Sequence, residues 1–356
     1  AELMMQRLIQ SKPELMSSTV VVSLTDRGKI ASTLKEMGVT VISLNMRSAF
    51  SLLKIIFRLY KIIRSYRPSV IQTWMYHANL LGGIASRIAN NKNIIWSIRR
   101  SKLDHLDSKV TFIVMKLCAI LSSVVPHTIV CVADSAFQQH VKYGYNKNKM
   151  IVIPNGYDLS VLKFDKIDRN HIRNKLHIAN DHIVVGIVGR FHNSKDYHNF
   201  VMSASMVIPY FENVRFMMIG RDLDDKNKTL KKWIDKTSHA DRFLLLGEVN
   251  KIAPYMSAMD IFCLSSRTEG FPNVVAEAMC IGLPCVVTNV GDIKKVVGTA
   301  AIITEPCSNE ALSDGLFKML NYSNKHRKEI GVEARNRINT LFKINSVCDK
   351  YYQLYY

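Results

Sequence analysis

Residues 261–281 read Ile-Phe-Cys-Leu-Ser-Ser-Arg-Thr-Glu-Gly-Phe-Pro-Asn-Val-Val-Ala-Glu-Ala-Met-Cys-Ile and combine a strand, a loop and a helix. The apolar run at 261–264 predicts a short buried strand. Gly270 permits a tight turn and close approach of the backbone, and Pro272 suits the first turn of a helix because its missing N–H costs little there. A buried strand followed at once by a helix is typical of a βαβ unit in a parallel sheet.

The same alternation of apolar strands and amphipathic helices extends in both directions from this stretch. In the second half we expect strands at 183–188, 215–219, 243–246, 261–264, 284–288 and 300–303, and helices at 196–208, 228–238, 251–258, 273–281, 308–320 and 325–341. In the first half we expect strands at 19–24, 39–44, 70–73, 94–98, 128–132 and 150–153, and helices at 26–37, 50–66, 78–90, 106–124 and 134–143. Each half therefore predicts a doubly wound α/β domain with a parallel sheet.

A polar, charged stretch from Asp158 to Asp181 separates the two series and is interpreted as the linker between domains. We expect a first Rossmann-like domain over residues 1–158 and a second over 159–342, with a last helix at 343–356 that packs back on the first. Two such sheets place the carboxyl ends of their strands, where ligands bind, towards one another across a cleft.

The charge of the chain is strongly positive and uneven. There are 48 Lys+Arg against 29 Asp+Glu, and residues 1–160 hold 21 of the former and 8 of the latter. A basic half predicts an anionic partner, which can be nucleic acid, an acidic membrane surface or a phosphorylated substrate. The alternative is a solvated surface rich in lysine. No nucleic-acid-binding module is apparent, so we expect no nucleic-acid partner.

The seven cysteines are scattered, without a CxxC pair or a His/Cys cluster at metal-ligand spacing. We therefore expect no metal site, and a reducing compartment. The longest apolar run, 110–125, contains Lys116 and is shorter than the ~20 residues that cross a bilayer. No GxGxxG element follows a strand, which argues against an NAD-dependent dehydrogenase.

The helix expected to begin at Asn273 would direct backbone N–H groups and a positive dipole end into the crevice, which suits a diphosphate. Glu269 in the preceding loop and Glu277 about one turn inside the helix can accept paired hydrogen bonds from the vicinal hydroxyls of sugars. The alternative for two glutamates near a helix start is a solvated surface that complements the helix dipole.

A second loop, directly after the strand at 183–188, contains Gly189 and two cations, Arg190 and Lys195. Arginine offers a planar fork to phosphate and lysine a point charge. Taken alone this loop is a weak signal, because basic loops after strands are common.

Together these segments resemble family-four retaining glycosyltransferases of the GT-B fold. Five motifs carry the likeness in order over about residues 150–290. The E-x7-E element is matched by Glu269 and Glu277, and the phosphate loop by Gly189, Arg190 and Lys195. The other three are matched by Pro154-Asn155-Gly156-Tyr157-Asp158, by the strand-end glycines Gly220 and Gly247, and by Gly282-Leu283-Pro284-Cys285-Val286-Val287.

The resemblance implies a role for each matching residue. Arg190 and Lys195 would neutralise the donor diphosphate, Glu277 would bind the ribose hydroxyls, and Glu269 would contact the transferred sugar. Further donor contacts are implied for Gly189, Gly270, Phe271, Pro272 and Asn273, and for Gly247 and Val249, whose backbone would read the base. A nucleoside diphosphate sugar is then the co-substrate, with no metal and no other cofactor.

In the first domain, on the acceptor side, the resemblance places His77 against the donor sugar, while a capping or packed histidine is the alternative. Arg99 and Arg100 follow the strand at 94–98 and are candidates for a donor or acceptor phosphate, or for a surface position. Ala1-Glu2 resembles the end of the family's G-G-A-E loop, and from this resemblance we expect that the first strand and the glycine pair of the family are lacking.

The resemblance predicts a retaining, metal-independent hexosyltransferase. It would move a sugar from a UDP-hexose or UDP-N-acetylhexosamine to a glycan or polyprenyl-linked acceptor during synthesis of bacterial surface polysaccharide such as O-antigen. The alternatives are a sugar-nucleotide epimerase of the same fold and, from another class, a basic nucleic-acid-binding protein.

The helix expected within residues 50–67 carries Lys54, Arg58, Lys61 and Arg64 near one face. A basic amphipathic helix predicts binding to an anionic membrane surface, here as a peripheral protein on the cytoplasmic face of the cell membrane. The alternative is a helix that only packs on the sheet through its apolar side.

Overall fold

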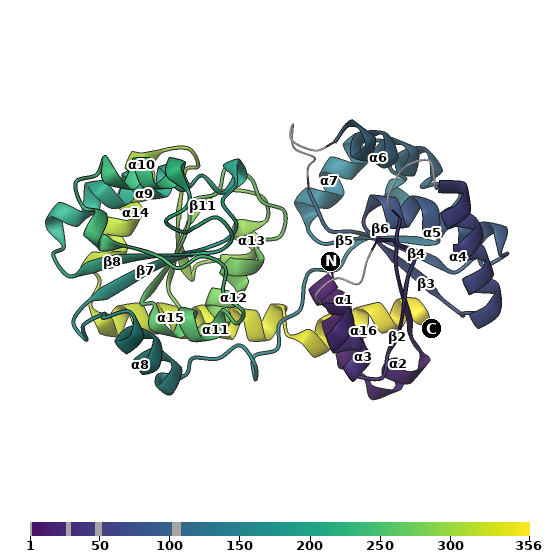
Figure 1. Ribbon diagram of the computed structural model, residues 1–356, viewed down its shortest axis with the longest axis horizontal. Coiled ribbons are helices and arrows are strands. Elements are labelled where there is room, and N and C mark those ends of the chain that lie inside the picture. The colour runs from purple at the N-terminus through teal and green to yellow at the C-terminus, as the bar shows by residue number, and fades with distance from the viewer. Residues whose placement is uncertain (1, 26–29, 47–51, 102–107) are drawn as a thin grey trace. The chain divides into compact units, whose positions relative to one another are not determined.

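The computed structural model describes residues 2–25, 30–46, 52–101 and 108–356. The chain folds into two compact units, one formed by residues 1–156 with 344–356 and the other by residues 157–343 (Figure 1). Ala1 and the first residues of the helices predicted from 26, 50 and 106 lie outside the described residues. In the described part of the chain, no helix combines the length and the apolarity needed to cross a bilayer.

Residues 157–343 are built around six parallel strands in the order β12-β11-β10-β7-β8-β9. The chain starts in the middle of the sheet, moves to one edge, and returns to build the other half from β10 onwards. This order confirms the doubly wound unit predicted from the alternating pattern. The strands are β7 (Ile183–Val188), β8 (Val214–Ile219), β9 (Phe243–Leu245), β10 (Ile261–Leu264), β11 (Cys285–Thr288) and β12 (Ala301–Thr304).

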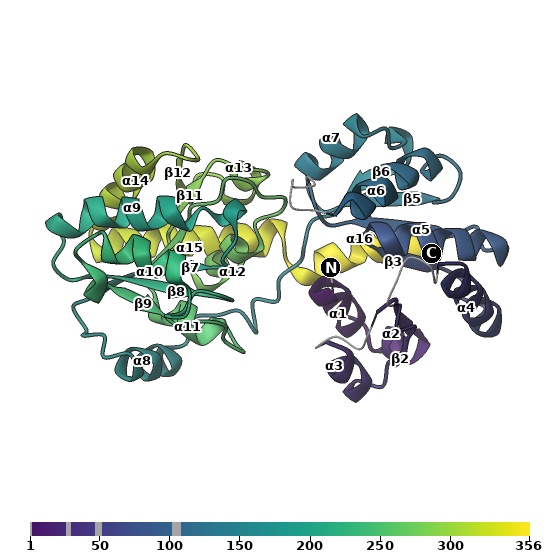
Figure 2. The same ribbon diagram turned by 45° about the horizontal axis from the view of Figure 1, so that its top comes forward.

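Helices cover both faces of this sheet (Figures 1 and 2). One face is covered by α9 (Tyr197–Val207), α10 (Lys228–Asp235) and α14 (Asn309–Asn321). The opposite side carries α8 (Lys166–Lys175), α11 (Ala253–Ala258), α12 (Asn273–Ile281) and α15 (Asn324–Leu341), while α13 (Ile293–Val297) is a short helix absent from the predicted series. The core between α9 and the sheet contains Phe200 and Phe216, both fully buried.

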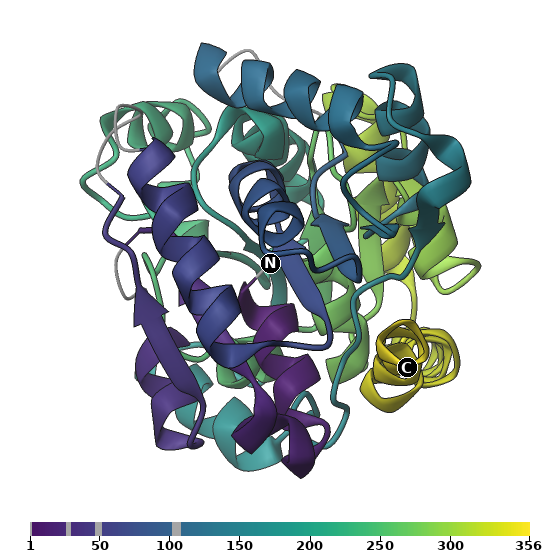
Figure 3. The same ribbon diagram turned by 90° about the vertical axis from the view of Figure 1, so that its right-hand side faces the viewer.

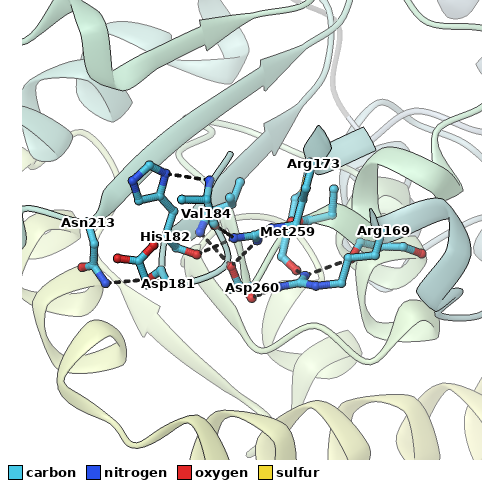
Figure 4. Close-up of polar contacts among 11 residues, drawn as sticks. Arg169, Arg173, Asp181, His182, Val184, Asn213, Met259 and Asp260 are labelled. Atoms are coloured by element: carbon cyan, nitrogen blue, oxygen red, sulfur yellow. Dashed lines mark hydrogen bonds and ion pairs between the residues drawn. The ribbon is translucent and has the colours of Figure 1, made fainter. Parts of the chain in front are cut away.

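The polar stretch predicted as a linker contains α8, which belongs to this unit. Arg173 of α8 is only 3% exposed and donates to Asp260 Oδ2 at 3.2 Å, and Arg169 pairs with Asp260 Oδ1 at 2.7 Å (Figure 4). Asp260 directly precedes β10 and also accepts the backbone N–H of Val184 in β7 at 2.8 Å. The linker prediction is wrong for this part, because arginines held by a shared carboxylate give a helix the composition of a solvated segment.

The strands of the first unit form two sheets. A four-stranded parallel sheet has the order β3-β4-β5-β6, and β1 pairs with β2 in a separate parallel sheet. The single sheet expected from the alternating pattern is therefore divided in the described part of the chain, and the lack of a preceding strand and Gly-Gly loop stays a prediction. The strands are β1 (Val20–Ser23), β2 (Thr40–Ser43), β3 (Ile71–Trp74), β4 (Ile94–Ile98), β5 (Thr128–Cys131) and β6 (Met150–Val152).

Helix α5 (Tyr76–Ile88) packs on β3 and β4 and lies between α4 (Leu52–Tyr66) and α6 (Lys109–Leu121). The last helix, α16 (Ile344–Tyr355), shares a core with α1 (Glu2–Gln10) and with β4 and β5. The remaining helices are α2 (Pro13–Ser18), α3 (Ile30–Glu36) and α7 (Asp134–Lys142). Figure 3 looks onto this unit, with the dark-blue α4 and the blue α5 and α6 in front.

Candidate active site

Strands β7 and β10 are neighbours in the sheet of residues 157–343, and the strand order reverses between them. The loop after β7 contains Gly189, Arg190 and Lys195, and the loop after β10 leads through Glu269 to α12. In open α/β sheets, ligands bind outside the carboxyl ends of the strands at the point where the order reverses. The fold thus brings two loops that are distant in sequence to the place where a ligand is expected.

An ion pair joins the two loops at this point. Lys195 Nζ lies 2.5 Å from Glu269 Oε1, and the side chains are 19% and 12% exposed. The hydroxyl of Ser266 donates to the same carboxylate oxygen at 2.7 Å. A lysine ammonium has three N–H donors, so Lys195 can hold Glu269 and a phosphate oxygen at the same time.

Further contacts fix the backbone on either side of that pair. The hydroxyl of Ser265 donates to the carbonyl oxygen of Lys195 at 2.7 Å, and the N–H of Arg267 donates to the carbonyl of Ser194 at 2.8 Å. The Arg267 guanidinium binds both oxygens of the buried Asp196, at 2.8 and 2.9 Å. These contacts position the ammonium group of Lys195 before any ligand binds.

Glycines allow the neighbouring loops to approach closely. A Cβ atom at Gly220, after β8, would collide with the carbonyl of Gly189, whose oxygen also accepts the Tyr197 hydroxyl at 2.7 Å. Gly291, after β11, has φ +55°, and a Cβ atom there would collide with the carbonyls of Glu269 and Gly270. Gly291 was not among the predicted site residues, although a glycine in a loop after a strand of this sheet was a usable signal.

Helix α12 begins at Asn273, as predicted, with Pro272 as its N-cap residue. Asn273 Oδ1 accepts the hydroxyl of the fully buried Tyr157 at 2.8 Å, and the Tyr157 ring stacks on Phe271. Glu277 lies half-buried in the second turn of the helix, on the same side as Asn273. Tyr157 is part of the motif at 154–158, but nothing in the sequence shows that its side chain contacts the first residue of α12.

Arg190 is exposed directly after β7, next to Gly189. Gly247 lies after β9 with φ +63°, and its carbonyl accepts the N–H of Gly220 at 2.8 Å. Val249 is half-buried two residues further on. All of these residues therefore lie at the carboxyl edge of the same sheet, and their roles in donor binding stay predictions.

The candidate site residues from the first half of the sequence lie in the unit formed by residues 1–156 and 344–356. His77 is in the first turn of α5, where partial burial lowers its pKa below the ordinary value near 6.5. Arg99 is held by the Tyr351 hydroxyl at 3.0 Å and by Asn155 Oδ1 at 2.5 Å, with its guanidinium over the Trp74 ring. Arg99 thus binds α16 and the 154–158 motif to the sheet, and half-buried Arg100 follows it.

The described residues contain no group of three His, Cys, Asp or Glu side chains that could hold a metal ion. The candidate residues at the carboxyl edge of the second unit carry charges of both signs, with the two cations Arg190 and Lys195 in the loop after β7 and the carboxylates Glu269 and Glu277 after β10. Such a set can bind a group that is anionic at one end and rich in hydroxyls at the other.

Comparison with known proteins identifies two domain families. Residues 168–337 match the family described as Glycosyl transferases group 1, and residues 17–161 match Glycosyltransferase Family 4. The chain is similar to the capsular polysaccharide biosynthesis glycosyltransferase CapM of Staphylococcus aureus, at 24% identity over 86% of this chain and 81% of CapM. It is also similar to the UDP-Gal:alpha-D-GlcNAc-diphosphoundecaprenol alpha-1,3-galactosyltransferase of Escherichia coli, at 27% identity over 67% of this chain and 62% of that protein.

Solved structures share the fold over nearly the whole chain. The structure of Anabaena HepE in complex with UDP superposes with a TM-score of 0.85 at 19% identity, covering 99% of this chain and 94% of HepE. Sucrose-phosphate synthase from Thermosynechococcus elongatus gives a TM-score of 0.80 at 18% identity, covering 99% and 92%. The predicted two-domain α/β fold of the GT-B type is confirmed.

Proposed function

The chain belongs to the glycosyltransferases that join a family 4 domain to a group 1 domain, and on this premise we propose that it transfers a sugar from a UDP-sugar, with retention of configuration, to a hydroxyl group of a glycan or polyprenyl-linked acceptor. The donor is a UDP-hexose or a UDP-N-acetylhexosamine. The product belongs to a bacterial surface polysaccharide, as the name of the CapM relative, a capsular polysaccharide biosynthesis glycosyltransferase, suggests.

The observation that carries this proposal is the Lys195–Glu269 pair at the switch point of the second sheet. Lys195 is mostly shielded from water and shares its loop with the exposed Arg190, and the loop of its partner Glu269 leads into the N-terminus of α12. Together these groups suit the diphosphate of the donor. The carboxylate of Glu269 has one oxygen bound by Lys195 and Ser266. Its other oxygen would accept a hydroxyl of the transferred sugar.

The proposed reaction depends on stabilising the charges that develop as the donor bond breaks. The bond between the anomeric carbon and the phosphate oxygen breaks, and positive charge builds on the sugar ring while negative charge builds on the leaving UDP. Lys195, Arg190 and the start of α12 stabilise the leaving group, and preorganised donors of this kind contribute roughly 3–4 kcal/mol each in oxyanion sites. The acceptor oxygen bonds to the same face of the anomeric carbon, and its proton passes to the leaving phosphate oxygen.

The other groups have supporting roles in this proposal. Glu277 binds the ribose hydroxyls, and the backbone of Gly247 and Val249 contacts the base. His77, whose lowered pKa favours the neutral imidazole at neutral pH, is proposed to contact the donor sugar. We propose that no metal takes part, and that Lys195, Arg190 and the helix dipole supply the positive charge that a metal ion would otherwise provide.

The acceptor and the place of action follow from charge and from the relatives. The E. coli relative is named for a diphosphoundecaprenol substrate, and the first half of this chain is strongly basic. We therefore place the protein peripherally on the cytoplasmic face of an anionic membrane, where a polyprenyl-linked acceptor is accessible.

A panel of nucleotide sugars tests the donor. We expect UDP and one UDP-sugar to raise the melting temperature, and Arg190→Ala to weaken that shift, whereas Lys231→Ala on α10, away from the two loops, leaves it unchanged. If no nucleotide sugar raises the melting temperature, the proposal fails. If the donor sugar is converted without any acceptor, the protein is an epimerase instead.

A further inference from the structure

Helix α6 presents an unusually apolar face to solvent. Five of its 13 residues have large apolar side chains that are at least 42% exposed, and the most exposed of them, Ile120, reaches 74%. At 100° per residue they fall on one side of the helix, while Met115, Cys118 and Ala119 on the opposite side are buried. The five exposed side chains are Val110, Phe112, Ile113, Leu117 and Ile120.

Two lysines share this face. Lys109 and Lys116 are exposed, and Lys116 Nζ lies 5.8 Å from the centre of the Phe112 ring. An exposed face on α4 has the same composition. Leu53 is 83% and Phe57 55% exposed, and Lys61 Nζ lies 4.6 Å from the centre of the Phe57 ring.

The Asp, Glu, Lys and Arg residues of the layer formed by α4, α5 and α6 are all basic. Helix α4 has four basic residues, α5 one and α6 two, and none of the three contains an acidic residue. Over residues 37–133 the sequence has 13 Lys+Arg and two Asp+Glu. Helix α5 packs on β3 and β4, with α4 on one side of it and α6 on the other, and Figure 3 looks onto the three helices.

We infer that α6 is the element by which this protein inserts into the surface of an anionic bilayer, and that the exposed face of α4, on the other side of α5, makes a second contact. Exposed apolar side chains enter the boundary between headgroups and acyl chains, and lysines at the same level meet anionic headgroups. The inference deepens the proposed function by naming the surface that binds the membrane, and it moves the main contact from α4, predicted from its basic residues, to α6.

Charge argues against two other occupants of this face. A second copy of the chain, related by two-fold symmetry, would bring lysines against lysines, because a two-fold interface pairs the same patch on both molecules. A nucleic acid would use the cations but leave five apolar side chains without a partner. A bilayer that contains anionic lipid satisfies both components.

Flotation with lipid vesicles tests the inference. We expect wild type to bind vesicles that contain about one-third phosphatidylglycerol and to bind pure phosphatidylcholine weakly. The double variant Ile113→Ser/Ile120→Ser should bind the anionic vesicles at least about tenfold more weakly, since each side chain loses its burial. Ile167→Ser on α8, where the side chain is 80% exposed, is the matched control and should bind like wild type.

Insertion can be detected directly with Ile120→Trp, whose fluorescence should shift to the blue with anionic vesicles and be quenched by brominated lipids. Wild-type binding by the double variant, or an Ile120→Trp fluorescence that brominated lipid does not quench, would overturn the inference. A dimer in solution that the double variant dissolves, without vesicle binding, would assign the face to a second copy. Thermal stabilisation by UDP, measured without lipid, reports separately on the proposed donor site.

Discussion

The sharpest test of the donor site is to remove the ammonium group of Lys195. In Lys195→Ala the Glu269 carboxylate, 12% exposed, keeps the Ser266 hydroxyl but loses its cation at 2.5 Å. An incompletely compensated, mostly buried carboxylate costs about 1–3 kcal/mol. For a unit of this size the melting temperature should fall by roughly 2–12 °C.

The effect on catalysis should be larger than the effect on stability. Loss of one preorganised donor to the leaving diphosphate removes roughly 3–4 kcal/mol of transition-state stabilisation, so kcat should fall about 10²–10³-fold. Turnover is measured as UDP release with acceptor present, at a temperature where the variant is folded. Lys231→Ala on α10 is the matched control for loss of a lysine elsewhere in the same unit.

A second substitution separates the two effects. In Lys195→Ala/Glu269→Gln the unpaired charge is gone, so most of the lost stability should return while turnover stays low. The reasoning is refuted if Lys195→Ala turns over within about fivefold of wild type, a difference below that expected for one donor. It also fails if the double variant is no more stable than Lys195→Ala, because the carboxylate then does not depend on that lysine.

Three further predictions concern Tyr157, metal ions and His140. Tyr157→Phe removes the hydroxyl bound to Asn273 and should raise the donor KM severalfold with little change in kcat, for a loss of about 0.5–1.5 kcal/mol; an unchanged KM would show that Tyr157 does not position α12. Turnover should be the same with and without EDTA, and EDTA inhibition that Mg²⁺ or Mn²⁺ reverses would contradict the metal-free proposal. Burial lowers the pKa of His140 to about 4, and its neutral ring donates to the Ala136 carbonyl and accepts the Tyr76 hydroxyl. Because the unfolded chain protonates this histidine near pH 6.5, stability should fall as the pH is lowered from about 6.5 towards 4, by up to about 3 kcal/mol, and chemical denaturation should show a smaller fall for His140→Gln.

The sequence predicted the elements of the second unit closely because their signals are local. The strands 183–188 and 261–264 and the helix 273–281 lie where expected, since a continuous apolar run between a breaker and a helix has few other interpretations. The polar stretch before β7 misled because its two arginines resemble solvated charges, whereas Asp260, about 90 residues away in sequence, buries them. That partner is visible only once β10 lies beside β7.

What the sequence determined by itself is the order of the elements and the types of charged residue placed after each strand, because periodicity, glycine and proline act over a few neighbours. It also identified the loops that contain Lys195 and Glu269. The tertiary structure alone decided that these two side chains form an ion pair, and that Ser266, Gly291 and Tyr157 support the loops. It also decided that the guanidinium of Arg99 is hydrogen-bonded to Tyr351 and Asn155. Strand pairing brings together residues far apart in the chain, and no local pattern records which side chains then come into contact.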